Sequence, residues 1–337
     1  MVNPQITQIT QNNLCNLRMA FIFPGQGSQN SGMGKDLAEN FTAARQVFEE
    51  ADDALGFSIS RLCFEGPAED LQLTENTQPA ILTVSVAAFH AMQEAGMGSP
   101  AFVAGHSLGE YSALVAAGAL QLSDAVRTVR ARGRYMQEAV PVGTGAMVAV
   151  IGGELSDIQR VCAEASQRQI CSVANINSPN QIVIAGSTEA VDRAIESLKG
   201  IAKRVIKLNV SAPFHCALMK PAQYRLAQDL AKLVFNEPAM PVVTNVDARV
   251  TTAPDELRDA LVRQVSAPVR WLESMQLLMQ QGVDTFVEAG PGKVLSGLMR
   301  QISRDARTLN VEDAASLETS IINSQRSKHD ARSRDRE

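Results

Sequence analysis

The stretch Ala101-Phe102-Val103-Ala104-Gly105-His106-Ser107-Leu108-Gly109 decides the fold of this chain. Its first five residues are apolar, as in a short buried strand. The small-residue run from Ser107 to Leu120 predicts a helix directly after that strand. Because a strand that turns abruptly into a helix is the repeating unit of a parallel α/β sheet, we expect such a sheet with helices on its faces.

The residues from Gly105 to Gly109 also form a G-x-S-x-G pattern, which places a serine on a sharp strand-to-helix turn. Glycines two residues to either side relieve crowding, so the hydroxyl of Ser107 stands clear of the sheet at a helix N-terminus. Backbone N–H groups and the helix dipole favour a developing oxyanion there. Although the pattern also occurs by chance in glycine-rich loops, its flanks favour a nucleophilic serine.

The rest of the chain divides into a large part and an insertion. Apolar strands and helices alternate on both sides of the turn, which predicts an α/β-hydrolase-like large subdomain with a parallel sheet core, made of residues 19–142 and 212–315. Residues 143–211 follow the order βαββαβ, which predicts an inserted ferredoxin-like small subdomain. We expect residues 1–18 to be a flexible extension and residues 316–337 to be a disordered polar tail.

Composition excludes several classes of protein. The chain has 337 residues, 45% of them hydrophobic, and a net charge of -5, so a basic nucleic-acid-binding domain is not expected. No apolar run approaches the roughly 20 residues that span a membrane, and the first 18 residues lack the order of a signal peptide. The five cysteines are odd in number and lack paired spacing, which indicates reduced thiols rather than a zinc site. We therefore expect a cytoplasmic protein without a metal.

A serine nucleophile needs a base, and the chain has four histidines. His329 lies in the polar tail, and His90 lies on an alanine-rich helix. His106 is adjacent to the serine on a sharp turn, so we expect it to line the pocket rather than transfer a proton. His215 lies in a loop where the small subdomain ends, a position that suits a catalytic group. The residues alone leave open that His215 is an ordinary hydrogen-bonded loop histidine.

The acid of a catalytic triad is not evident from the sequence. Asp124, Asp157 and Asp192 lie between Ser107 and His215, where an α/β-hydrolase acid would lie, but all three fall within predicted helices or cap them. A Ser–His dyad with its imidazole oriented by a backbone carbonyl would explain the absence.

Several motifs in one order carry a resemblance to a known family. They are Pro24-Gly25-Gln26-Gly27-Ser28-Gln29, Gly105-His106-Ser107-Leu108-Gly109-Glu110-Tyr111, Arg132-Gly133-Arg134-Tyr135-Met136-Gln137 and Ala212-Pro213-Phe214-His215, with further matches at residues 174–179 and 288–292. Together they closely resemble the malonyl-CoA:acyl carrier protein transacylases of type II fatty acid synthesis. The resemblance covers residues 19–310.

The resemblance implies an activity and two partners. The chain would move a malonyl group from malonyl-CoA to the phosphopantetheine thiol of acyl carrier protein by a ping-pong route. Ser107 would carry the malonyl ester, and His215 would be the general base. No cofactor is implied, and we expect a monomer. Acyl carrier protein is acidic and this chain is net negative, so docking needs a local basic patch, for which Lys203, Arg204 and Lys207 are our hypothesis.

The resemblance also implies roles for further residues. The backbone N–H groups of Gln26 and Leu108 would form the oxyanion hole, and Arg132 would bind the malonyl carboxylate. Composition alone cannot choose among Arg127, Arg130, Arg132 and Arg134. A bulky Phe214 would disfavour an α-methyl group. The remaining implied residues support the base or line the pocket: the Gln264 main-chain carbonyl would hold His215, while Gln78, Asn175, His106 and Met136 would be pocket-lining.

Two other functions remain open at this stage. A serine thioesterase or other hydrolase could use the same nucleophilic turn and would release free malonate. An inactive acyltransferase-like module could act only as a scaffold, although the presence of both Ser107 and His215 argues against it.

Overall fold

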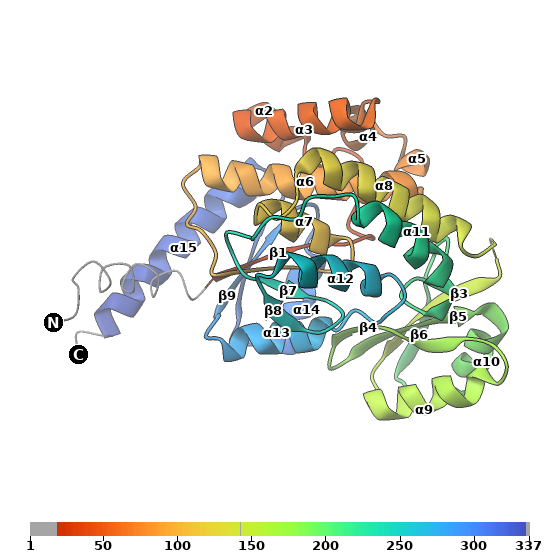
Figure 1. Ribbon diagram of the computed structural model, residues 1–337. Coiled ribbons are helices and arrows are strands. Elements are labelled where there is room, and N and C mark those ends of the chain that lie inside the picture. Colours follow the sequence, from red (N-terminus) through yellow and green to blue (C-terminus); the bar gives the residue numbers. More distant parts are fainter. Residues whose placement is uncertain (1–18, 142, 335–337) are drawn as a thin grey trace.

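The computed structural model describes residues 19–141 and 143–334, with side chains described as far as Ser324. The expected N-terminal extension, residues 1–18, lies outside the described residues. Figure 1 shows a large part built around a mixed sheet and a smaller lobe built on a second sheet. The expected α/β fold with an inserted small subdomain is confirmed.

The large sheet brings the loops that follow two of its central strands together at the carboxyl ends of the strands. Its strand order is β10-β9-β1-β2-β7-β8, and all pairs are parallel except β7 with β8. The strands are β1 (Met19–Phe23), β2 (Phe102–Gly105), β7 (Val242–Thr244), β8 (Arg249–Thr251), β9 (Thr285–Ala289) and β10 (Arg307–Val311). Phe23 pairs with Gly105 at the carboxyl ends of the central strands β1 and β2. The loops that follow these strands therefore emerge side by side, where α/β sheets bind ligands.

Alternating side chains of β1 supply both faces of this sheet. Phe21 and Phe23 pack into the main core with the long helix α6 (Thr74–Glu94), while Ala20 and Ile22 pack against the opposite layer around Trp271. The helices of the main-core side include α2 (Lys35–Asn40), α3 (Thr42–Leu55), α4 (Ile59–Glu65), α5 (Ala68–Gln72), α7 (Gly109–Ala116) and α8 (Leu122–Glu138). Helices α13 (Trp271–Gln280) and α14 (Val294–Ile302) cover the other face.

The small lobe has the order βαββαβ. Its elements are β3 (Gly145–Ile151), α9 (Leu155–Ser166), β4 (Cys171–Ser178), β5 (Gln181–Ser187), α10 (Thr188–Leu198) and β6 (Arg204–Lys207). The sheet is antiparallel with the order β4-β5-β3-β6. Val148 and Val150 face helices α9 and α10, whereas Met147 and Ala149 face the main core. This alternation turns one face of the small sheet toward the large part (Figure 1).

Backbone hydrogen bonds join the two parts. Ile176 N–H in β4 donates to the Val269 carbonyl at 2.9 Å, and Val269 N–H donates to the Ala174 carbonyl at 2.9 Å. The segment between the lobe and this contact holds a 3-10 turn (Ala217–Met219), α11 (Lys220–Leu230) and α12 (Pro254–Gln264). Strand β4 therefore pairs with both subdomains.

The expectation of a disordered tail from residue 316 is wrong for the described residues. Helix α15 runs over Ala314–Arg334. Leu317 and Ser320 on it are buried, and Ile321 packs against the main core. The polar composition of this segment did not indicate a buried face. Leu317 and Ile321 lie four residues apart on one side of the helix, and this apolar pair is enough to pack its first turns against the core.

Within residues 19–141 and 143–334, no helix has the length and apolarity to cross a membrane.

Candidate active site

Ser107 occupies the strained turn that the pattern predicts. Its φ angle is +51°, in the left-handed region, between β2 and α7. A Cβ atom at Gly105 would lie 1.8 Å from the Gly109 carbonyl oxygen, and one at Gly109 would lie 2.1 Å from the Phe23 carbonyl oxygen. Only glycine at both positions lets the strand and the helix approach this closely, and the close approach holds the serine in its unusual conformation.

The structure brings His215 to this serine. Ser107 Oγ lies 2.7 Å from His215 Nε2, although the two residues are 108 positions apart in sequence. His215 Nδ1 lies 2.9 Å from the Gln264 carbonyl oxygen, the contact expected for Gln264. Because a carbonyl can only accept, Nδ1 carries the proton and Nε2 is free to accept one from the serine.

None of the three aspartates considered from the sequence contacts the histidine. Asp124 pairs with Arg127, Asp157 with Arg160 and Asp192 with Lys207. The pair Ser107 and His215 therefore forms a dyad whose imidazole is oriented by a backbone carbonyl.

The imidazole of His215 is held in its neutral form. Burial, and after it repulsion of a second positive charge by the nearby Arg132 guanidinium, lower the pKa of His215 to about 3. The hydrogen bond to the Gln264 carbonyl raises the pKa of His215, but by less than burial and Arg132 lower it. At neutral pH His215 is therefore an unprotonated base beside the hydroxyl.

Arg132 is the one arginine of its helix segment that reaches the site. It is 1% exposed, whereas Arg127 and Arg134 pair with acids at the surface and Arg130 stacks over Phe57. The structure thus makes the choice among the four arginines that composition could not make.

The Arg132 guanidinium is held by two glutamine side chains. Its Nη1 donates to Gln78 Oε1 at 2.8 Å, and its Nη2 donates to Gln264 Oε1 at 2.9 Å and to Ser107 Oγ at 3.3 Å. Its buried Nε has no hydrogen-bond partner among the described residues. A cation with spare donor capacity therefore lies directly beside the hydroxyl, where a substrate carboxylate could reach it.

A cavity of about 410 Å³ opens over these groups. Besides Ser107, His215 and Arg132, it is lined by these residues expected at the site: Gln26, Leu108, Gln78, His106, Met136, Asn175 and Phe214. The loop that carries Gln26 is held by a hydrogen bond from Ser28 Oγ to the Gly25 carbonyl at 2.9 Å. Gln26 and Leu108 thus line the same cavity as the serine.

His106 lies in the cavity wall and not on the proton path. Its Nε2 is 2.8 Å from Asn177 Oδ1, and its ring packs edge-on against Trp271. Burial lowers its pKa, so it too is neutral.

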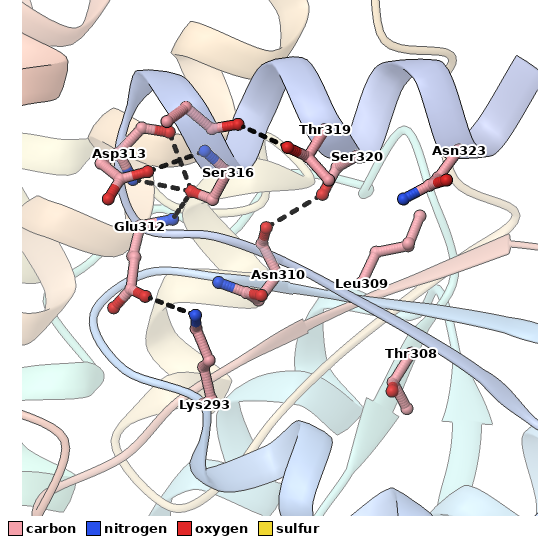
Figure 2. A pocket seen from close by; sticks show the side chains of 11 residues that line it. Lys293, Thr308, Leu309, Asn310, Glu312, Asp313, Ser316, Thr319, Ser320 and Asn323 are labelled. Carbon is pink, nitrogen blue, oxygen red and sulfur yellow. Dashed lines mark hydrogen bonds and ion pairs between the residues drawn. The ribbon is translucent and has the colours of Figure 1, made fainter.

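A second cavity of about 410 Å³ lies between β10 and α15 (Figure 2). Several of its polar groups bind one another: Lys293 Nζ is 3.2 Å from Glu312 Oε1, and Ser320 Oγ donates to the Asn310 carbonyl at 2.9 Å. Its described lining contains neither histidine nor cysteine. The chemistry therefore points to the cavity over Ser107.

The nucleophilic turn is also supported by two residues for which the sequence predicted no role, Asn245 and Glu110. Ser107 N–H donates to Asn245 Oδ1 at 2.6 Å, and Glu110 Oε2 accepts from Asn245 N–H and from Gln264 Nε2. Glu110 directly follows the G-x-S-x-G pattern, which by itself indicates no role for a glutamate there. Asn245 directly follows β7 at the carboxyl edge of the sheet, and that position was the signal that could have identified it.

The arrangement is suited to acyl transfer. A hydroxyl with a neutral base can attack a carbonyl, and an adjacent cation can bind an acidic acyl group. Among the described residues, no group of three or more histidine, cysteine or acidic side chains is placed to hold a metal ion.

Comparison with known proteins gives consistent matches. The model of the acyl transferase domain family matches residues 20–334. The malonyl CoA-acyl carrier protein transacylase of Escherichia coli K12 is 52% identical over 85% of this chain and 93% of that relative, and the Bacillus subtilis 168 protein of the same name is 48% identical over 90% and 96%.

Solved structures agree with these matches. An acyl carrier protein S-malonyltransferase from Vibrio cholerae superposes with a TM-score of 0.88 at 49% identity, covering 90% of this chain and 99% of that chain. A malonyl-transacylase in complex with its type II polyketide synthase acyl carrier protein gives a TM-score of 0.89 at 49% identity, covering 91% and 99%.

Proposed function

The chain belongs to the family of acyl transferase domains, and we infer that it is a malonyl-CoA:acyl carrier protein transacylase. The observation that carries the malonyl assignment is the 3.3 Å contact between Arg132 Nη2 and Ser107 Oγ. In a malonyl thioester a single methylene separates the reacting carbonyl from the free carboxylate. The cation that binds the carboxylate must therefore lie within a few ångströms of the nucleophile, as Arg132 does.

In the first half-reaction Ser107 Oγ attacks the thioester carbonyl of malonyl-CoA while His215 Nε2 takes the hydroxyl proton. The tetrahedral oxyanion accepts hydrogen bonds from the backbone N–H groups of Leu108 and Gln26, which border the cavity. Collapse of this intermediate breaks the carbon–sulfur bond. The CoA thiolate leaves with the proton from His215, and the malonyl group remains as an ester on Ser107.

In the second half-reaction the pantetheine thiol of acyl carrier protein takes the place of CoA. His215 removes the thiol proton, the thiolate attacks the malonyl ester, and the proton returns to Ser107 as its bond to the acyl carbon breaks. Serine, base and cation all come from the chain, so the reaction needs no cofactor.

Mass spectrometry tests the covalent step. After mixing with malonyl-CoA, the peptide that contains Ser107 should carry a malonyl adduct, and holo-acyl carrier protein should remove it. An unmodified peptide in active protein contradicts the route. If CoA release with free malonate is as fast without carrier protein as with it, the protein is a hydrolase instead.

The role of Arg132 is tested by its alanine variant. A buried carboxylate without its cation is strongly destabilised, so Arg132→Ala should slow malonyl transfer on the order of 100- to 1,000-fold and slow acetyl transfer less. Arg127→Ala, on the exposed side of the same helix, is the matched control. Equal losses for malonyl and acetyl groups would show that Arg132 is structural.

Strand register narrows the proposed basic patch for acyl carrier protein. Ile206 pairs with Ala149, which lines the cavity, and Arg204 pairs with Ile151 on the same face. Lys207 pairs with Val148 on the opposite face and forms an ion pair with Asp192 of α10 at 2.6 Å. By alternation, Lys203 also belongs to that opposite face. Arg204 is therefore the one of the three basic residues that we propose contacts the carrier protein beside the cavity.

Charge reversal distinguishes the two faces. Arg204→Glu should raise the KM for acyl carrier protein several-fold, because an exposed charge at an interface mainly changes association. Lys207→Glu is the matched control on the same strand and should leave that KM close to wild type. The same increase in both variants would place the docking surface elsewhere.

We propose that the enzyme acts as a monomer in the cytoplasm. The four described cysteines, Cys63, Cys162, Cys171 and Cys216, are free, which fits a reducing compartment. Light scattering that returned twice the mass of one chain would contradict the monomer.

A further inference from the structure

The nucleophilic turn is held from both sides by amide side chains. On one side, Asn245 Oδ1 accepts from Ser107 N–H at 2.6 Å, and Asn245 Nδ2 donates to the Gly105 carbonyl at 2.7 Å. On the other side, Gln264 Nε2 donates to the Ser107 carbonyl at 2.9 Å. Both the N–H and the C=O of a residue in the left-handed region are thus fixed by groups from outside its own loop.

One carboxylate oxygen joins these two residues, through the main-chain N–H of Asn245 and the side-chain amide of Gln264. Glu110 Oε2 accepts from Asn245 N–H at 3.0 Å and from Gln264 Nε2 at 2.8 Å. Glu110 is fully buried on the first turn of α7, and its other oxygen, Oε1, has no partner among the described residues. A single buried acceptor atom therefore fixes residues from the segment after β7 and from the end of α12.

The orientation of the Gln264 amide matters for the rest of the site. Because its Nε2 faces two acceptors, Glu110 Oε2 and the Ser107 carbonyl, its Oε1 must face Arg132 Nη2, which it accepts at 2.9 Å. A reversed amide would place an N–H₂ group against the guanidinium. The backbone carbonyl of the same Gln264 accepts from His215 Nδ1. Nucleophile, base and substrate cation all contact this one residue.

We propose that Glu110 is a positioning residue, which, through Asn245 and Gln264, sets the conformation of the Ser107 turn and the direction of the Arg132 guanidinium. It touches neither substrate nor the reacting atoms. Burial raises the pKa of Glu110 to about 7. Because Oε2 can accept both hydrogen bonds whether or not Oε1 carries a proton, the device requires an acceptor oxygen rather than a negative charge.

The test measures single-turnover formation of the malonyl ester on Ser107 in full-length protein. Misplacement of reacting groups by a fraction of an ångström slows chemistry more than it weakens binding, so Glu110→Ala and Asn245→Ala should slow acylation on the order of 10- to 100-fold with little change in the half-saturating malonyl-CoA concentration. Glu110→Gln retains an acceptor oxygen of the same reach and should recover most of the rate.

A second buried glutamate provides the matched control. Glu288 is also fully buried and also accepts two N–H groups, from Leu295 at 3.0 Å and from Ser296 at 2.7 Å, but it does not contact the turn. Glu288→Ala should lower the unfolding free energy in the same way yet acylate at nearly the wild-type rate.

Two results would overturn the proposal. One is an acylation rate for Glu110→Ala within about threefold of wild type. The other is an equal loss in Glu288→Ala, which would reduce the effect to general destabilisation. If Glu110→Ala does not fold, Glu110→Leu decides between the same outcomes, because it fills the buried space and offers no acceptor oxygen to Asn245 N–H and Gln264 Nε2.

Discussion

Arg132 is a buried cation whose direct acceptors are two amide oxygens and one hydroxyl. Amides orient a guanidinium without neutralising it, so its charge stays available to a substrate carboxylate and acts on its neighbours. One of these neighbours is His215, whose pKa is lowered first by burial and then by this charge. A single arginine therefore both selects the acyl group and keeps the base unprotonated.

At the scale of the residue, we predict an acylation rate that does not depend on the titration of an ordinary histidine. The base must be neutral, and its pKa of about 3 leaves it neutral over the whole range from neutral pH to mildly acidic pH. The rate of malonyl-Ser107 formation should therefore stay nearly constant between about pH 7.5 and pH 5.5. If the histidine had its ordinary pKa near 6.5, the acylation rate would fall roughly tenfold between about pH 7.5 and pH 5.5. A fall of that size would contradict the prediction.

At the scale of the element, the strand–turn–helix unit works because three backbone segments meet without side chains between them. Gly105 abuts the Gly109 carbonyl, and Gly109 abuts the Phe23 carbonyl of β1. The loop after β1 and the loop after β2 are thereby held next to each other, which places the Gln26 backbone near the nucleophile.

We predict that alanine at either glycine destabilises the fold. An added methyl group would overlap backbone atoms that cannot move independently, so Gly105→Ala and Gly109→Ala should each lower the unfolding free energy by about 1–3 kcal/mol or more. Gly297, within α14, has open space around its Cβ direction. Gly297→Ala should instead raise stability by roughly 0.5–1 kcal/mol. Urea denaturation measures all three, and unchanged midpoints for the first two would refute this account.

Helix α15 gives a second prediction at this scale. Leu317 is 1% exposed, and Ile322 on the same helix is 45% exposed. Leu317→Ala should lower the unfolding free energy by about 2–5 kcal/mol, while Ile322→Ala should change it by less than about 0.5 kcal/mol. If both substitutions are neutral, α15 does not pack on the core in solution.

At the scale of the whole molecule, the two subdomains share a core. Met147, Ala149 and Val183 of the small sheet belong to the same apolar cluster as Phe23 of β1, and the Ala174, Ile176 and Val269 backbones are paired across the boundary. The wall of the active site is therefore part of this shared packing. A lobe that separated easily would remove Asn175 and Met147 from the wall of the cavity that contains the serine.

We accordingly predict that both subdomains unfold in one transition. Trp271, the single tryptophan, is fully buried in the large part, so its fluorescence reports that part alone. Far-ultraviolet circular dichroism reports helices and strands of both parts. The two urea midpoints should coincide, as in a two-state transition. A separate early change in dichroism would show that the small lobe melts independently.

Much of the molecule could be predicted from the sequence because the deciding signals are local. The pattern around Ser107 forces a tight turn through steric exclusion at two glycines, and the alternation of short apolar runs with helical ones defines both sheets. The tail could not be predicted in the same way, because Leu317 is one apolar residue in a polar segment and becomes informative only when a core lies against it.

The sequence by itself determined the nucleophilic turn, the order of the elements and a short list of bases and cations. Only the tertiary structure decided which of those groups act together. Ser107 meets His215 from 108 positions away, Arg132 is the one arginine of its segment turned into the cavity, and Asn245 and Glu110 gained a role that their local sequence did not indicate. The physical reason is that a hydrogen bond depends on distance and direction in space, and these are set by how sheets and helices pack rather than by proximity along the chain.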